Sequence, residues 1–90
     1  MSFKKAMNRN KILKIYEKII SGPIKPVKWQ DIEALFEALG ATQRKSDGSS
    51  RTFYINGRPL TIHKPHPENE IKKYAVKHIR DYLLKNNLKP

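Results

Sequence analysis

The sequence predicts an α+β fold in which helices cover one face of a small antiparallel sheet, giving a two-layer sandwich. Three observations support this prediction. The length of 90 residues suits a single domain with one modest core. Apolar residues recur at helical spacing before Gly40 and again after Pro67, and between these points the spacing changes to that of strands. Within that middle part, Asn56-Gly57 lies between two β-prone runs, which is the strongest short-range signal of a hairpin.

A first helix is predicted over residues 8–20, because its apolar residues recur with a period that places them on one face. These residues are Ile12, Ile15 or Tyr16, and Ile19. Ser21-Gly22-Pro23 ends the helix, since glycine accepts the left-handed conformation of a C-terminal cap and proline cannot continue a helix. The segment that follows is expected to be a short, stiff connector to Lys28.

A second helix is predicted over residues 29–39, and Gly40 ends it. Its apolar stripe consists of Ile32, Leu35, Phe36 and Leu39. Asp31 and Glu33 suit the positive N-terminus of this helix. Trp29, at its start, is expected to act as a packing anchor rather than as a platform for base stacking.

Three strands are predicted next, over residues 41–45, 51–55 and 58–63, with a loop at 46–49. A two-residue turn sets Ile55 opposite Arg58 and Phe53 opposite Leu60. Residues that face each other share one side of the sheet, so one side is apolar: Phe53, Ile55, Leu60 and Ile62. The other side is expected to be polar and solvated: Ser50, Thr52, Tyr54, Thr61 and His63.

Residues 63–67 are expected to leave the sheet as a rigid loop, because their two prolines exclude both a ladder and a helix. The last helix is predicted over residues 72–86, with Asn86-Asn87 as its C-cap. Its inward side chains are expected to be Ile71, Ala75, Ile79, Tyr82 and Leu83. Its largely outward side chains are expected to be Lys72, Lys73, Lys77, Arg80 and Lys85.

The predicted α-β-β-β-α order matches the double-stranded-RNA-binding fold, with one additional helix at the N-terminus. We therefore expect two parts: an N-terminal helical extension and linker over residues 1–27, and a domain over residues 28–90. A fold of this kind does not by itself establish a function.

The charge of the chain points to a polyanionic partner. Nineteen Lys and Arg oppose eight Asp and Glu, giving a net charge of +11, and the basic residues concentrate toward the two ends of the chain. A field of this sign attracts nucleic acids, and RNA is the partner that this fold favours. The chain has no cysteine, which excludes a disulfide framework and agrees with a cytoplasmic location. We expect no membrane partner, no cofactor and no metal site, since His63 and His66 without further ligands make a poor one.

The segment from Trp29 to Ala41 resembles the first helix and glycine stop of the HicA (YcfA-like) toxin family. The loop Gly48-Ser49-Ser50-Arg51, the hairpin, and His66-Pro67 before a basic helix follow in the family's order, so that the resemblance covers residues 28–88. The resemblance implies a double-stranded-RNA-binding-like fold and a small toxin of a toxin–antitoxin pair. It further implies an mRNA interferase that acts without the ribosome and is neutralised by a HicB antitoxin.

The family's functional residue is a histidine in a Gly-Ser-His motif, and in this chain Arg51 stands at that position. Arginine is not deprotonated in proteins, so Arg51 can hold a phosphate but cannot act as a base. His63 and His66 could supply proton transfer instead, because histidine titrates near neutral pH. The alternative is that His66 shapes the turn and His63 is a solvated strand end.

Eight residues are candidates for RNA binding: Ser50, Arg51, Tyr54, Arg58, Lys64, Lys72, Lys73 and Lys77. Tyr54, on the open side of the sheet, is the candidate for stacking on a base. The lysines of the last helix could contact phosphates, or they could be a solvated helix face. Three functions remain open at this point: an mRNA interferase, an RNA-binding module without catalysis, and a basic domain that binds DNA or an acidic protein.

Overall fold

The computed structural model describes residues 8–46 and 48–90 and confirms the α+β prediction. Residues 1–7 of the predicted extension and Asp47 of the predicted loop lie outside the described residues. The elements follow the predicted order, with two further short strands: α1 (Arg9–Ile20), β1 (Val27–Lys28), α2 (Trp29–Ala38), β2 (Thr42–Lys45), β3 (Ser50–Ile55), β4 (Arg58–His63), β5 (Glu70–Ile71) and α3 (Lys73–Lys85).

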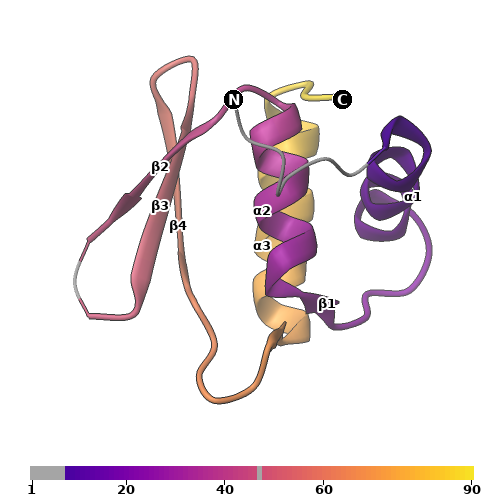
Figure 1. Ribbon diagram of the computed structural model, residues 1–90. Helices are drawn as coiled ribbons and strands as arrows, with labels where there is room; N and C mark the ends of the chain where they lie inside the picture. The colour runs from indigo at the N-terminus through magenta and orange to yellow at the C-terminus, as the bar shows by residue number, and fades with distance from the viewer. Residues whose placement is uncertain (1–7, 47) are drawn as a thin grey trace.

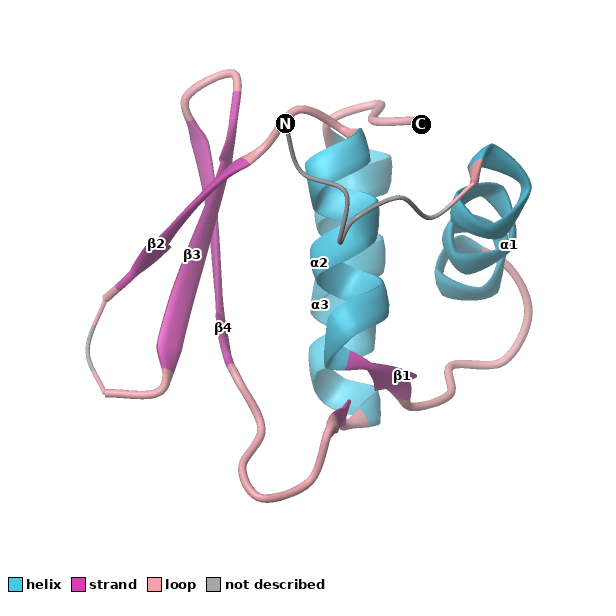
Figure 2. Ribbon diagram, viewed as in Figure 1, coloured by secondary structure: helices cyan, strands magenta, loops and turns pink. Residues whose placement is uncertain are grey.

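The molecule has three layers (Figure 1). β2, β3 and β4 form an antiparallel sheet in that order. α2 and α3 lie on one face of this sheet and contact each other through the rings of Phe36 and Tyr82, whose centroids are 6.1 Å apart. α1 packs on both helices from the side away from the sheet (Figure 2). Within the described residues, no helix combines the length and the hydrophobicity that crossing a membrane requires.

The predicted hairpin register is confirmed. Ile55 pairs with Arg58, Phe53 with Leu60, and Ser50 with His63. The turn takes positive φ at both central residues, 52° at Asn56 and 76° at Gly57, which is the conformation that a two-residue turn between twisted strands requires. The register therefore brings Ser50 and His63 to the same end and the same face of the sheet.

The short, stiff connector predicted to run to Lys28 ends in a strand that the sequence analysis did not predict. Val27 and Lys28 pair with Ile71 and Glu70 in a separate two-stranded ladder. Val27 and Ile71 are buried in it, at 1% and 3% exposure. This ladder joins the start of α2 to the start of α3, and it therefore fixes the loop that carries His66.

The expectation of a solvated outer sheet face was wrong at Thr52, which is only 6% exposed. Its hydroxyl lies 2.7 Å from that of Thr61 and 2.9 Å from that of Ser46. A buried hydroxyl with partners on both sides carries little desolvation cost. Thr52 therefore belongs to the framework behind the outer face rather than to the surface itself.

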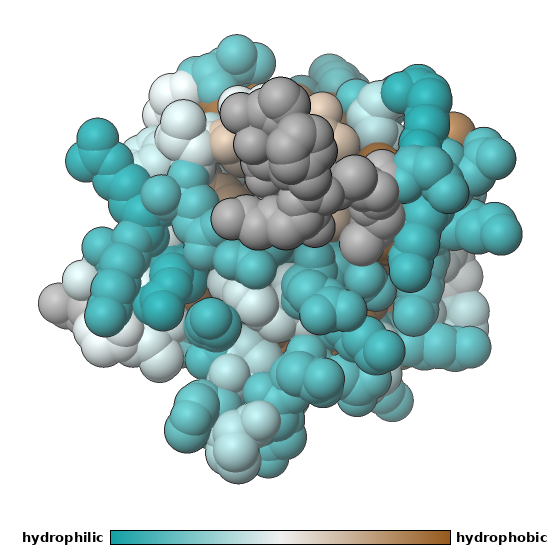
Figure 3. Space-filling view, viewed as in Figure 1, coloured by the Kyte–Doolittle hydropathy of each residue, from teal (hydrophilic) through white to brown (hydrophobic). Residues whose placement is uncertain are grey.

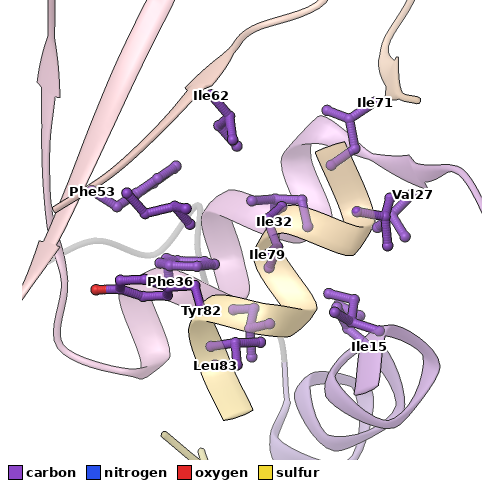
Figure 4. Packing of buried hydrophobic residues seen from close by; sticks show 14 of the residues in the cluster. Ile15, Val27, Ile32, Phe36, Phe53, Ile62, Ile71, Ile79, Tyr82 and Leu83 are labelled. Atoms are coloured by element: carbon purple, nitrogen blue, oxygen red, sulfur yellow. The ribbon is translucent and has the colours of Figure 1, made fainter. Parts of the chain in front are cut away.

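One core extends from the sheet through α2 and α3 to α1 (Figure 4). Phe53 and Ile62 of the sheet point toward Ile32, Phe36 and Ile79 of the helices. The rings of Phe36 and Phe53 are 4.6 Å apart, and Trp29 lies 5.9 Å from Phe53, which confirms it as a packing anchor. On the surface seen from the same side as Figure 1, hydrophilic side chains cover most of the molecule (Figure 3).

α1 is tied to the rest of the molecule by polar contacts as well as by its buried stripe. Arg80 of α3 was expected to point largely outward, but its Nε donates to the Ile19 carbonyl at 2.6 Å and its Nη2 to the Gly22 carbonyl at 2.8 Å. These carbonyls at the end of α1 need partners, and the guanidinium supplies them. Tyr16 donates its hydroxyl to the Leu88 carbonyl at 2.9 Å, and burial, with a smaller effect of Glu17, raises its pKa.

Candidate nucleic-acid interface

His63 lies at the end of β4 beside Ser49 and Ser50, which form the junction between the preceding loop and β3; we call residues 48–50 the serine loop. Its Nδ1 is 3.3 Å from the Ser49 hydroxyl and 3.4 Å from the Ser50 hydroxyl. The His63 side chain is exposed, so a ligand can reach the ring. In a neutral imidazole one ring nitrogen donates a hydrogen bond and the other accepts one. If Nδ1 donates to a serine hydroxyl, Nε2 is the acceptor, and if Nδ1 accepts from a hydroxyl, Nε2 is the donor.

The loop that carries these serines is held by backbone contacts on both sides. The Lys64 amide donates to the Ser49 carbonyl at 2.8 Å, and the Ser46 amide donates to the Ser50 carbonyl at 3.0 Å. Gly48 takes a φ of 52°, a left-handed conformation that glycine adopts without a steric penalty. The two serine hydroxyls are therefore placed by the backbone, and the buried Thr52 hydroxyl supports the same corner of the sheet.

Arg51 occupies the neighbouring position in β3, but the pleat of the strand directs it to the opposite face from His63. It pairs with Ile62 and Lys45, on the side of the sheet that faces the helices. Its Nη1 donates to the Gly48 carbonyl at 3.3 Å and to the Ser50 carbonyl at 3.1 Å. Arg51 thus braces the serine loop, and its remaining guanidinium donors have no partner among the described residues.

Both candidate histidines line one groove, which has a volume of about 570 Å³. Lys64 and Lys72 line it too, together with the start of α3. Lys73, the first residue of α3, is also exposed. The structure therefore gathers His63, His66, Lys64 and Lys72 in one groove beside the serine loop, and Lys73 follows directly in the chain.

Three of the predicted binding residues lie apart from this group or already have a partner. Arg58 follows the hairpin turn, about 15 Å along β4 from His63, and its guanidinium donates to the Asn86 side chain. Lys77 forms an ion pair of 3.2 Å with Asp81, the only ion pair among residues 8–46 and 48–90. Tyr54 is half-buried on the outer face, and the Arg44 guanidinium lies 5.9 Å from its ring centre.

Sequence reasoning missed three residues of this surface. Ser49 contacts His63 as closely as Ser50 does, and its place in the Gly-Ser-Ser motif was the available signal. Arg44 shares the outer face with Thr52 and Tyr54, which the alternation along its strand could have indicated. Tyr74 is 71% exposed and lines the same groove as the histidines, and its position outside the apolar stripe of the last helix was a signal.

The groups that this surface offers are imidazoles, hydroxyls, guanidinium and ammonium groups. Within the part of the chain that the structure describes, no cluster of three or more His, Asp or Glu side chains is arranged to hold a metal ion. Imidazoles can transfer protons, and the cationic groups can hold and neutralise phosphate oxygens. The arrangement suits acid–base chemistry on a phosphodiester.

A comparison with protein families finds one match. The model described as the HicA toxin of bacterial toxin–antitoxin systems matches residues 29–87, from the start of α2 to just beyond α3. No curated protein and no solved structure matches the chain significantly. α1 lies before the matched region.

Proposed function

Because the chain belongs to the HicA toxin family, we propose that it is a toxin that binds mRNA and cleaves it as an mRNA interferase. The observation that supports this proposal best is the contact of His63 with the hydroxyls of Ser49 and Ser50, beside a groove with His66 and two lysines. A solvent-accessible imidazole can transfer a proton, and cationic groups beside it can stabilise the charge that develops on a phosphodiester during cleavage.

In the proposed reaction the 2′-oxygen of a ribose attacks the adjacent phosphorus and the bond from phosphorus to the 5′-oxygen breaks. One histidine takes the proton of the 2′-hydroxyl, and the other gives a proton to the departing 5′-oxygen. His63 suits the role of base when its Nδ1–H donates to a serine hydroxyl, because Nε2 then accepts the proton. His66, on the same groove, is the candidate acid.

Arg51, Lys64, Lys72 and Lys73 are proposed to hold phosphates around the scissile bond. Arg51 has a double role in this proposal. Its Nη1 braces the serine loop, and its free donors contact the phosphate at the edge of that loop. Ser50 positions His63, Tyr54 offers a further stacking surface on the outer face, and Arg58 and Lys77 contact more distant phosphates.

The protein partner is proposed to be a HicB-type antitoxin in the cytoplasm. The family is that of toxins in toxin–antitoxin pairs, so an antitoxin is the counterpart to look for. The net charge of +11 favours an acidic partner, because opposite charges speed and orient association. An antitoxin that covers the His63 corner would block RNA from the groove.

Controlled expression in a bacterial host tests the proposed function directly. We expect expression of the chain alone to arrest growth and to fragment mRNA. Co-expression of the proposed antitoxin, encoded by a reading frame next to the gene of this chain, should restore growth. Purified protein should cleave a labelled single-stranded RNA in the presence of EDTA, since imidazoles supply the proton transfer. RNA binding without cleavage would instead indicate a binding module, and preferential binding to DNA over RNA would contradict the proposal.

RNA affinity is expected to fall with salt in proportion to the number of phosphates contacted. Six contacts, by Arg51, Arg58, Lys64, Lys72, Lys73 and Lys77, predict a log–log slope of about −4.2, at roughly −0.7 for each phosphate of a single strand. Titrations of labelled RNA at several salt concentrations measure this slope.

The matched control separates these contacts from general charge. Lys72→Gln should reduce the magnitude of the slope by about 0.7, whereas Lys85→Gln, at the far end of α3, should leave it unchanged. An affinity that hardly responds to salt, or an equal effect of the two variants, would show that these lysines serve solubility alone.

A further inference from the structure

Tyr74 is the most exposed large apolar side chain among the described residues, at 71% exposure. It lies in the first turn of α3, between Lys73 and the buried Ala75. The apolar stripe of α3 does not use it, since the buried residues of that helix are Ala75, Val76, Ile79, Tyr82 and Leu83. The ring therefore offers a flat apolar face to a ligand, with a hydroxyl at its tip.

The ring lies where a nucleic acid would pass. Tyr74 lines the same groove as His63, His66 and Lys64. A base that stacks on an aromatic ring beside basic residues is the usual arrangement in proteins that bind single strands. A base inside a duplex is stacked on its neighbours and has no face to offer, so the ring favours an unpaired base.

The groove also contains two carboxylates, from Glu68 and Glu70. Both residues are exposed, and neither forms an ion pair within the described part of the chain. Carboxylates repel phosphates, so this part of the groove is unsuited to the backbone of the strand. They accept hydrogen bonds from amino groups, however, and the exocyclic amino group of a base is such a donor.

We propose that this groove takes one unpaired base of the RNA, stacked on Tyr74, with its amino group donating to Glu68 or Glu70 and the adjoining phosphates on Lys64 and Lys72. This inference rests on the proposed RNA binding and adds to it the substrate class. The protein selects single-stranded RNA, and it prefers an amino-bearing base such as cytosine to uracil, which offers a carbonyl at the same position.

Stacking is tested by binding of an RNA that contains 2-aminopurine and carries 2′-O-methyl groups, which prevent cleavage. Anisotropy reports binding, and quenching of the 2-aminopurine fluorescence reports stacking. We expect wild type and Tyr74→Phe to bind and quench alike, and Tyr74→Leu to bind about 5- to 100-fold more weakly without quenching. Leu84→Ala is the matched control, since Leu84 is also an exposed apolar residue of α3, at 52% exposure.

The outcomes separate this inference from the function on which it rests. Binding and quenching by Tyr74→Leu equal to those of wild type would overturn the stacking role while leaving RNA binding intact. Equal affinity for the single strand and for a duplex of the same length would also overturn it. Absence of RNA binding by wild type would overturn the proposed function, and the inference with it.

The carboxylates are tested by the ratio of affinities for 2′-O-methyl oligocytidylate and oligouridylate. We expect cytidylate to bind at least 5-fold more tightly, and the double variant Glu68→Ala, Glu70→Ala to bring the ratio close to one. Glu37→Ala removes an exposed carboxylate from α2 and should leave the ratio as in wild type. A wild-type ratio of one would overturn the role of the carboxylates.

Discussion

Replacing His63 by alanine is expected to slow RNA cleavage by about 10²- to 10⁴-fold, the usual loss when a general acid or base is removed. The physical reason is that, among the described residues, the His63 imidazole is the one that contacts the serine hydroxyls, at 3.3 Å and 3.4 Å. His66→Ala should also slow cleavage strongly, because the second proton transfer then falls to water. Rates of cleavage of a labelled single-stranded RNA under single-turnover conditions measure both effects.

His78→Ala is the matched control for this prediction. His78 is an exposed histidine of α3 that lines the groove against β4, together with Arg58 and Tyr82, and not the groove of His63 and His66. The His78→Ala variant should cleave the RNA at the wild-type rate. Since His63 is exposed and adds nothing to the core, its replacement should leave the melting temperature nearly unchanged. Rapid cleavage by a folded variant that lacks both His63 and His66 would remove them from the mechanism.

The three-stranded sheet and its register could be predicted because a local signal determined them. Asn56-Gly57 fits a turn with two positive φ angles, and a two-residue turn leaves a single register for the strands that it joins. The helices could be predicted for a similar reason, since each has an apolar stripe and ends just before a residue of positive φ: Gly22, Gly40 or Asn87. Only α1 has a side-chain cap at its start among the described helices, where Asn8 accepts from the Lys11 amide.

The features that escaped prediction depend on contacts between distant parts of the chain. The ladder between Val27 and Ile71 joins segments of two residues each, which are too short to have a periodicity. The bonds from Arg80 to the end of α1 link residues 58 and 61 positions apart. The alternation of side chains along β3 predicts that Thr52 is exposed on the outer face. Thr52 is buried instead, and its hydroxyl contacts those of Ser46 and Thr61.

Several residues of the candidate site could be predicted from the sequence, and so could the pairing of Ser50 with His63, but the rest of the arrangement could not. The register that places His63 opposite Ser50 also places Arg51 opposite Ile62, on the other face of the sheet. Ser50 and Arg51 are neighbours in the sequence, but their side chains lie on opposite faces. Lys64, Lys72 and His66 come together because the β1–β5 ladder fixes the loop between them, and that ladder had no sequence signal. Arg58 is basic like these residues, yet it lies at the opposite end of β4.

The role of α1 leads to the second large effect that we expect. The family match begins at residue 29, and α1 lies outside it, yet Ile19 is fully buried and α1 packs on both α2 and α3. Ile19→Ala should therefore destabilise the whole molecule by about 2–5 kcal/mol, through lost apolar burial and the cavity that remains. For a domain of this size that corresponds to a fall in melting temperature on the order of 10–40 °C.

Two probes and one control variant decide whether α1 belongs to the cooperative unit. Trp29, the single tryptophan, is buried in α2 against Phe53, so its fluorescence follows the matched domain, whereas far-ultraviolet circular dichroism follows all helices. Both transitions should shift together in Ile19→Ala, because one core unfolds in one step. Leu13→Ala, which removes a side chain that is 36% exposed on the same helix, should shift them little. A Trp29 transition that stays at the wild-type temperature while only part of the helical signal is lost would contradict this prediction, and α1 would then be an appendage that unfolds on its own.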